Sequence, residues 1–310
     1  MTWQKKGLIY VPAGKFGWDN NTVITPTPVM HNDETIRVYC GFRDKKGVSR
    51  IGYIDVSADN PSNVISVSET PVLDIGRPGC FDDNGMILGD VVYLNNEIRM
   101  YYVGFQIPQK IKFMAYSGIA LSKDNGKTFK RYSEVPIMER ADNALYIRAI
   151  HTAMFDNGRW KIWYSVGNRW ENINGIDYPQ YDIRYTESQD GFHFDDTVGK
   201  SCVGVNENEY RIGRPRVNKE PDGSYTMRYT SDTYDKKYRA GYATSKDGMN
   251  WTRIDTPREI DISSDGWDSE MACYPVFLDT GKKKFLFYSG NGMGATGVGY
   301  AKWNKTMRDR

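Results

Sequence analysis

The sequence predicts an all-β protein, a five-bladed β-propeller built from four-stranded antiparallel blades. One strand pattern with a shared tyrosine recurs five times along the 310 residues. Each copy also carries a hairpin signature, in which two β-rich runs flank a polar turn. No helix of normal length can be read from the hydrophobic spacing. Radial repetition of small sheets leaves few exposed strand edges, which suits a chain with so many short strands.

The tyrosine-bearing strand sets the repeat. It reads IRVYCG at residues 36–41 and RMYYVG at residues 99–104. The shared tyrosines are separated by 63, 62, 65 and 59 residues, so five copies account for the whole chain. These tyrosines are Tyr39, Tyr102, Tyr164, Tyr229 and Tyr288.

The other strands of each copy follow from the residues around that pattern. A short apolar strand such as residues 91–93 precedes the tyrosine strand, and a third strand such as residues 117–121 follows it. Three copies then continue through Ser-x-Asp-Gly type turns, at residues 122–126, 188–191 and 245–248, into a fourth strand. In each turn we expect the carboxylate to accept bonds from the turn's own backbone amides.

The last copy lacks a fourth strand, and the beginning of the chain supplies a candidate. Residues 3–6 read WQKK and match the openings of the fourth strands at Phe129 and Trp251. We therefore expect the N-terminal strand to complete the last blade and close the ring. The prediction is one domain over residues 1–310, with blades at about 19–75, 81–140, 145–204, 209–262, and 267–303 plus 3–11.

Composition excludes several function classes. The chain has 41 Lys and Arg against 39 Asp and Glu, a formal net charge of +2, which argues against nucleic acid or a membrane surface as partner. No apolar run is long enough for a membrane span or a secretion signal, so we expect a cytoplasmic protein. With four scattered cysteines and three histidines, we expect no disulfide framework, no metal and no cofactor. The oligomeric state is left open.

Charged residues gather just before the first strand of every copy. In a propeller these segments line a central funnel, so they are the candidates for a shared site. Carboxylates occupy this position in copies 1, 2 and 5, and cations occupy it in copies 3 and 4. The candidates are Trp18, Asp19, Asp82, Asp83, Arg148, His151, Glu209, Arg211, Arg214, Trp267, Asp268 and Glu270.

At these residues the sequence resembles the superfamily of five-bladed glycosidases that includes glycoside hydrolase families 43, 32, 68 and 130. Residues 81–85 (FDDNG) with 101–105, and residues 266–275 with 288–292, resemble an uncharacterised branch of that superfamily. The resemblance implies an axial Asp as base or nucleophile, a Glu as general acid and a third carboxylate.

Carried onto this sequence, the resemblance implies Asp19 as base or nucleophile, Glu270 as acid and Asp83 as the third group. Glycoside cleavage needs two carboxyl groups in unlike environments. Asp82 or Asp268 could replace Asp83, and Glu209 competes with Glu270 for the role of acid. For each carboxylate the alternative is a loop cap or a salt bridge.

The arginines suggest a negatively charged ligand. Guanidinium groups bind carboxylate or phosphate in a fork, and strand alternation places Arg214 and Arg216 on the same side. Arg148, Arg211 and Arg43 could contribute, and His151 could bind a hydroxyl or phosphate. Simple charge balance against the nearby aspartates is an equal alternative. Trp18 and Trp267 could stack on sugar rings or serve as core.

Three functions follow from these residues. The first is a glycoside hydrolase-like enzyme that cleaves an anionic or phosphorylated glycan with paired carboxylates. The second is an inverting phosphorylase, in which arginines hold the attacking phosphate. The third is a non-catalytic carbohydrate-binding propeller. In each, the expected partner is a small carbohydrate or glycan.

Overall fold

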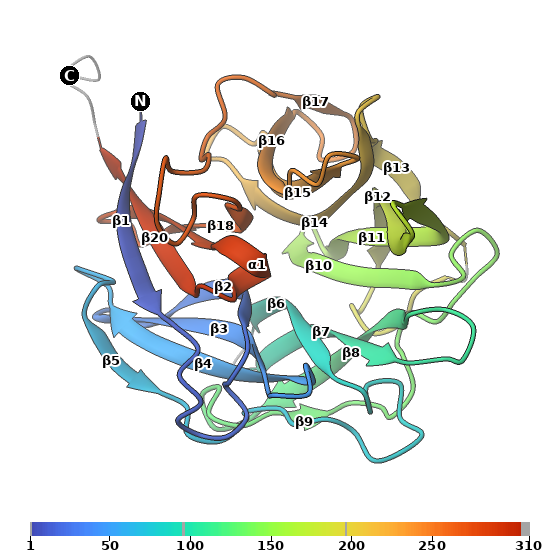
Figure 1. Cartoon of the computed structure of the whole chain (residues 1–310), viewed down its shortest axis with the longest axis horizontal. Helices are drawn as coiled ribbons and strands as arrows, with labels where there is room; N and C mark the ends of the chain where they lie inside the picture. The colour runs from blue at the N-terminus through green and yellow to red at the C-terminus, as the bar shows by residue number, and fades with distance from the viewer. Residues whose placement is uncertain (1, 95–96, 196, 305–310) are drawn as a thin grey trace.

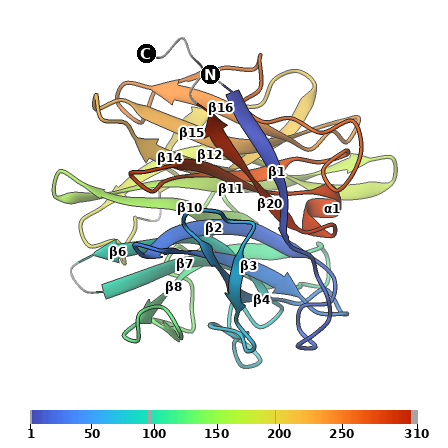
Figure 2. The ribbon, with the colours of Figure 1, turned by 90° about the vertical axis from the view of Figure 1, so that its left-hand side faces the viewer.

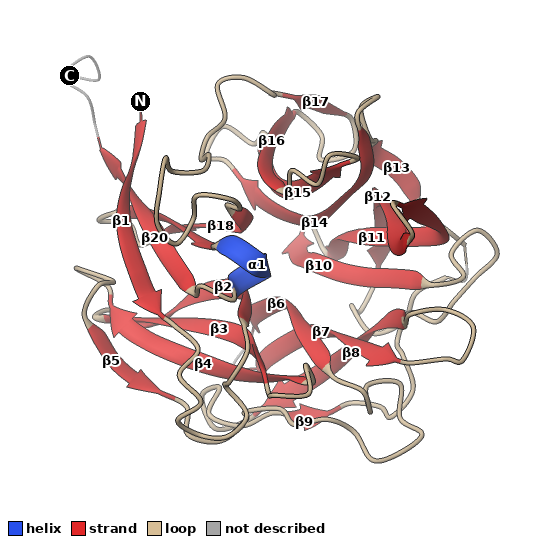
Figure 3. Cartoon of the chain, viewed as in Figure 1, coloured by secondary structure: helices blue, strands red, loops and turns tan. Residues whose placement is uncertain are grey.

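The computed structural model describes residues 2–94, 97–195 and 197–304, and this part of the chain is almost entirely β-structure. Strands β1 to β20 and a single four-residue helix, α1 (Asn291–Gly294), make up its regular elements (Figure 3). The all-β prediction is confirmed. Within these residues, none of the helical structure is long and apolar enough to span a bilayer.

Two of the sheets are four-stranded and antiparallel, with strands in chain order. The first contains β2 (Val23–Asn32), β3 (Thr35–Arg43), β4 (Ser49–Ser57) and β5 (Val64–Val67). The second contains β14 (Glu209–Lys219), β15 (Tyr225–Thr233), β16 (Arg239–Ser245) and β17 (Trp251–Arg253).

A third sheet joins the two ends of the described chain. It contains β18 (Cys273–Asp279), β19 (Lys284–Ser289), β20 (Val298–Asn304) and β1 (Thr2–Tyr10). Strand β1 pairs antiparallel with β20 (Figure 1). In this pairing Trp3 lies opposite Trp303.

The remaining eight strands form one sheet instead of the two separate blades that the repeat predicts. They are β6 (Met86–Leu94), β7 (Glu97–Gln106), β8 (Met114–Ser122), β9 (Lys130–Arg131), β10 (Ile147–Asp156), β11 (Arg159–Ile173), β12 (Ile176–Ser188) and β13 (Lys200–Val203). Two residue pairs, Ile147 with Ala115 and Arg148 with Tyr116, join β10 to β8 in parallel. This short pairing involves the first two residues of β10, which lie next to β8 of the preceding copy.

The first strands of the five copies contact one another in a closed cycle. Strand β2 contacts β6, β6 contacts β10, β10 contacts β14, β14 contacts β18, and β18 returns to contact β2. Figure 1 shows these strands at the centre of the molecule, with later strands of each copy farther out, and Figure 2 shows the same sheets from the side.

Each of these five inner strands is interrupted by a β-bulge. The pairing shifts between Ile24 and Thr27, Leu88 and Asp90, Ile150 and Thr152, Gly213 and Arg216, and Cys273 and Val276. Thr25, Arg214 and Tyr274 adopt positive φ at three of the bulges, and each precedes a proline. A bulge bends the strand and redirects the side chain at that point. It therefore sets which inner-strand side chains face the centre.

The repeated residues of the sequence support this arrangement. All five shared tyrosines are fully buried. In the polar turns, Asp124, Asp190 and Asp247 each accept bonds from two backbone amides of their own turn, as predicted. These bonds favour the ionised form, and the pKa of each carboxyl lies below its usual value.

The close approach of the inner strands can be tested by substituting Gly89, which lies at the bulge of β6. A methyl group there would meet the carbonyl oxygens of Ile150 and Tyr101. Gly89→Ala is expected to destabilise the protein by about 2 kcal/mol, because rigid backbone must shift to make room. Gly204→Ala is the matched control, since nothing lies within 4 Å of its added methyl. Equal urea midpoints for the two variants would contradict this packing.

Candidate active site

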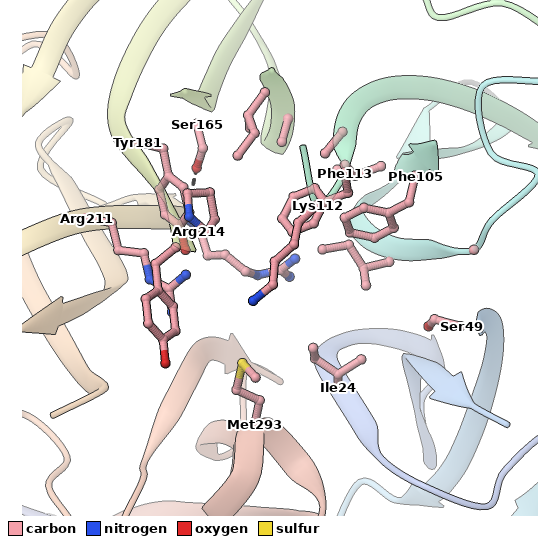
Figure 4. Close-up of a pocket in the computed structure, with 18 of the residues that line it drawn as sticks. Ile24, Ser49, Phe105, Lys112, Phe113, Ser165, Tyr181, Arg211, Arg214 and Met293 are labelled. Atoms are coloured by element: carbon pink, nitrogen blue, oxygen red, sulfur yellow. Dashed lines mark hydrogen bonds between the residues drawn. The ribbon is translucent and has the colours of Figure 1, made fainter. Parts of the chain in front are cut away.

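A cavity of about 400 Å³ lies where the inner strands converge. All five inner strands line it, through Ile24 of β2, Ile87 of β6, His151 of β10, Arg214 of β14 and Tyr274 of β18. Such a size and central position are typical of small-molecule sites. Figure 4 shows part of its lining.

One side of the cavity is cationic and aromatic. Arg211 and Arg214 of β14 lie beside Tyr181 of β12 (Figure 4). Ser165 of β11 lies next to Arg214. The guanidinium carbon of Arg214 lies 5.3 Å from the ring centre of Tyr274. That of Arg211 lies 5.6 Å from the ring centre of Tyr181 and 5.1 Å from that of Tyr238. Aromatic faces stabilise guanidinium groups without neutralising them.

Arg214 is the least compensated of these cations. Its side chain is buried, and Nη1 donates to the carbonyl oxygen of Leu88 at 2.7 Å. Nε and Nη2 are buried with no hydrogen-bond partner among the described residues. Burial lowers the pKa of the Arg214 guanidinium to about 10, and Arg216 adds repulsion. A buried guanidinium with two unpaired nitrogens is suited to an anionic ligand.

Arg211 is held more firmly. Its Nη2 donates to Oδ2 of the buried Asp232 at 2.6 Å, and Lys236 donates to the same oxygen at 2.7 Å. Tyr210 also donates its hydroxyl to that carboxylate. Two cations thus share one carboxylate, and this part of the wall keeps a net positive charge. Asp232 acts here as a positioning residue for Arg211.

The bulge in β14 separates the two arginines that strand alternation places together. Arg214 lines the cavity, whereas Arg216 does not. Arg216 donates to the carbonyl oxygens of Gly89 and His151, both at 2.6 Å, and forms a 2.7 Å ion pair with Asp90. The prediction that Arg214 and Arg216 point to the same side of the strand is therefore wrong, because the extra residue of the bulge breaks the alternation of side chains.

The charges in the described lining are unbalanced. Arg43, Lys112, Arg211 and Arg214 are cationic, and Asp177 is the single acidic residue. Asp177 is exposed, and its side chain accepts a bond from Asn172 at 2.7 Å. The cavity favours a negatively charged ligand and does not present the carboxylate pair on which glycoside hydrolysis usually depends.

The structure does not bring the three predicted catalytic carboxylates into this cavity. Asp19 is fully buried outside it, where it accepts bonds from the Tyr10 hydroxyl at 2.8 Å and the Phe16 amide at 3.0 Å. Asp83 accepts bonds from the Gly79 amide and the Asn84 side chain within its own turn. Glu270 is exposed and is absent from the lining.

Four other predicted residues form structural contacts away from the cavity. Asp82 pairs with Arg131 at 2.7 Å, Asp268 with Lys5 at 2.7 Å, and Glu209 with both Nη atoms of Arg253. Arg148 donates to the carbonyl oxygens of Glu139, Asp195 and Thr197. The three carboxylates thus form salt bridges, which was the alternative to a catalytic role, whereas loop carbonyl oxygens and not the nearby aspartates bind Arg148.

The two predicted tryptophans pack against other aromatic rings and do not line the cavity. Trp18 is buried against Phe42 and donates Nε1 to the carbonyl oxygen of Glu69 at 3.0 Å. Trp267 stacks on Tyr288, with ring centres 4.9 Å apart. Of the substrate-binding candidates, His151, Arg211 and Arg214 line the cavity, together with the additional candidate Arg43.

Sequence reasoning missed the residues that come from outside the inner strands. Lys112 lies in the β7–β8 loop, and Tyr178 and Tyr181 lie on the long β11–β12 hairpin. Lys112 Nζ donates to the carbonyl oxygen of Asp177 at 3.2 Å, which links the loop to the hairpin. The unusual length of the second and third strands in copy 3 was the available signal.

Comparison with known proteins identifies the fold. The structure of a glycoside hydrolase aligns over 98% of this chain and 92% of its own, with 17% identity and a TM-score of 0.73. A structure from the GH130 family of mannoside phosphorylases, described as containing hydrolases of β-1,2 mannosidic linkages in Candida mannan, has 16% identity and a TM-score of 0.71. It covers 97% of this chain and 93% of its own. The fold is that of the propeller glycosidases.

Sequence comparison places the chain more narrowly. No protein-family model matches it. The uncharacterized protein Rv1502 of Mycobacterium tuberculosis is 30% identical over 303 residues, which cover 97% of this chain and 99% of that protein. The chain belongs to the same family as Rv1502.

His151 gives a pH-dependent test of the site. Its pKa lies well below the usual value because the ring is buried and faces the charges of Arg214 and Arg216. Below pH 6.5 the unfolded chain therefore binds a proton that the folded chain excludes. We expect His151 to cost about 1 kcal/mol of stability between pH 6.5 and 5.5. In His151→Gln the free energy of unfolding, measured in urea, should therefore fall less steeply between pH 6.5 and 5.5. The same pH dependence in the wild type and the variant would contradict this assignment.

Proposed function

We propose that this chain is a glycosidase-like enzyme that takes an anionic or phosphorylated glycan into the central cavity. The four sheets are inferred to form the five blades of a propeller, with the eight-stranded sheet supplying two of them, with the boundaries that the repeat predicts and with β1 completing the last blade. The cycle of contacts among inner strands and the pairing of β1 with β20 support this. The likeness to glycoside hydrolases and to a phosphorylase family supports carbohydrate as the ligand class.

The observation that carries the proposal is the uncompensated guanidinium of Arg214. Nε and Nη2 have no partners in the described chain and almost no exposed surface, so a ligand carboxylate or phosphate would satisfy both once the guanidinium turns towards the cavity. Arg211 and Lys112 lie in the same lining and add positive charge. Tyr181 and Tyr274 supply hydroxyl groups and ring faces for a sugar.

Phosphorolysis is a second candidate, and the count of charged groups favours it. In that reaction inorganic phosphate attacks the anomeric carbon, the glycosidic bond breaks, and one acid protonates the leaving oxygen. The cavity presents several cations and one carboxylate, Asp177, within the described lining. Phosphate bound at Arg214 would take the place of the second carboxylate. Hydrolysis through Asp19 and Glu270 has no such support from their positions.

Arg214→Gln tests the anion contact. We expect at least about tenfold weaker binding of methyl β-D-glucuronide or glucose 6-phosphate, measured by titration calorimetry, because a charge-assisted bond is lost. Arg159→Gln is the control, since Arg159 is exposed at the start of β11. Thermal unfolding should show that both variants are folded. Wild-type affinity in Arg214→Gln, or equal binding of neutral methyl glucosides, would refute the proposal.

Phosphate dependence separates the two reactions. With an anionic aryl glycoside as substrate, phosphorolysis predicts a sugar 1-phosphate that appears only when inorganic phosphate is present. Asp177→Asn should then reduce turnover by about 100-fold or more. Release of free sugar without phosphate, together with its loss in Asp19→Asn and Glu270→Gln, would instead establish paired-carboxylate hydrolysis.

A further inference from the structure

The cavity has a second side whose chemistry differs from that of the arginine wall. It consists of the side chains of Ile24, Ile87, Val103, Phe105, Phe113 and Met293, which we call the apolar wall. Figure 4 shows Phe105 and Phe113 across the opening from Arg211 and Arg214, with Ile24 and Met293 along a neighbouring edge. The arginine side and the apolar wall therefore line the same cavity.

The apolar wall is built from several elements that the ring brings together. Ile24 and Ile87 come from the inner strands β2 and β6, Phe105 from the end of β7, and Met293 from α1. Phe113 lies in the β7–β8 loop. It packs edge to face on Phe105, with ring centres 5.4 Å apart, and on Trp170, with ring centres 5.1 Å apart. These contacts hold its ring at the cavity in a fixed position.

Four of these side chains, Ile87, Phe105, Phe113 and Met293, are only partly buried. Their exposed surface lies inside a concave site, where apolar area in contact with water is unfavourable and marks a place for a ligand. In copies 1 and 2 the polar lining residues come from loops and strand ends. They are Arg43 at the end of β3, Ser49 at the start of β4, Asn84 in the turn before β6 and Lys112 in the β7–β8 loop.

A sugar ring alone does not suit such a wall. Each hydroxyl group that enters a site must find a hydrogen-bond partner, or the free energy of its desolvation is lost. The side chains of Ile24, Ile87, Val103 and Met293 offer no donor and at most a weak thioether acceptor. A hydrocarbon or aromatic group would bury this surface without leaving polar atoms unsatisfied.

We propose that the ligand is amphipathic: an anionic sugar joined to an apolar aglycone. This inference rests on the proposed function, because it assigns the anionic sugar to the Arg214 side. The aglycone then lies against the apolar wall. The cavity of about 400 Å³ takes a monosaccharide and a short part of the apolar group. Longer hydrocarbon would continue towards Ile107, which is 65% exposed at the rim.

Matched pairs of glycosides test this assignment by titration calorimetry, below the concentration at which they form micelles. One pair is methyl and hexyl β-D-glucuronide, and the other is methyl and hexyl β-D-glucoside 6-phosphate. The hexyl member should bind at least about tenfold more tightly, because additional methylene groups are buried. The pair with the higher affinity identifies the anion as carboxylate or phosphate. Neutral hexyl β-D-glucoside should bind more weakly than either hexyl anion.

Phe113→Ser provides the residue-level test. It should remove most of the hexyl advantage, so that the ratio of hexyl to methyl affinity falls towards one. Phe155→Ser is the control, since Phe155 is 44% exposed on β10 and does not line the cavity. Urea unfolding of both variants verifies that they are folded. A second variant, Met293→Ser, should show the same selective loss.

The outcomes distinguish the two proposals. If methyl and hexyl anions bind equally, the amphipathic ligand is refuted and the anionic glycan site stands. If hexyl glucoside binds as tightly as the hexyl anions, the anionic assignment fails and the apolar contact stands. If neither glucuronides nor glucoside phosphates bind, both proposals fail.

Discussion

The contact that organises this protein is the cycle formed by its five inner strands. Each strand reaches the centre with a bulge, and the bulges lock neighbouring copies together. Arg216 binds the carbonyl oxygens at the bulges of β6 and β10, while Thr152 donates to the carbonyl oxygen of Pro215 at 2.7 Å. Buried backbone groups need such partners, so the bulges and the cross-strand bonds depend on each other.

The same bends explain the electrostatics of the site. The bulge of β14 aims Arg214 into the cavity and directs Arg216 away from it. Arg216 meets Asp90 and is neutralised, whereas Arg214 retains a buried charge with free N–H groups. Leaving a buried guanidinium unpaired reduces folding stability, and an anionic ligand would recover that free energy on binding. Because the apolar wall lies opposite Arg214, a single ligand would contact a cationic surface on one side and an apolar surface on the other.

The sequence predicted the architecture better than the site. Regular spacing of Tyr39 to Tyr288 revealed the repeat, because each copy must bury the same strand face. A residue followed by proline marks three of the five bulges, including Arg214 before Pro215, and simple strand alternation ignores that signal and therefore misassigned Arg216. Asp19 and Asp83 were predicted to be catalytic from a family resemblance, yet local turn amides and the Tyr10 hydroxyl bind them. Arg211, Arg214 and His151 reach the cavity as expected. Lys112 comes from an outer loop that no local pattern specifies, and Tyr181 comes from a hairpin whose long strands were the available signal.

The most direct test of the central claim is a crystal structure of the complex with 4-bromophenyl β-D-glucuronide. The anomalous signal of bromine locates the aglycone independently of the sugar. Our account predicts the carboxylate within about 3 Å of Arg214 Nη2 and the bromine beside Phe113 and Met293. A ligand bound on the outer surface, or a carboxylate turned towards solvent with Arg214 still unpaired, would contradict it.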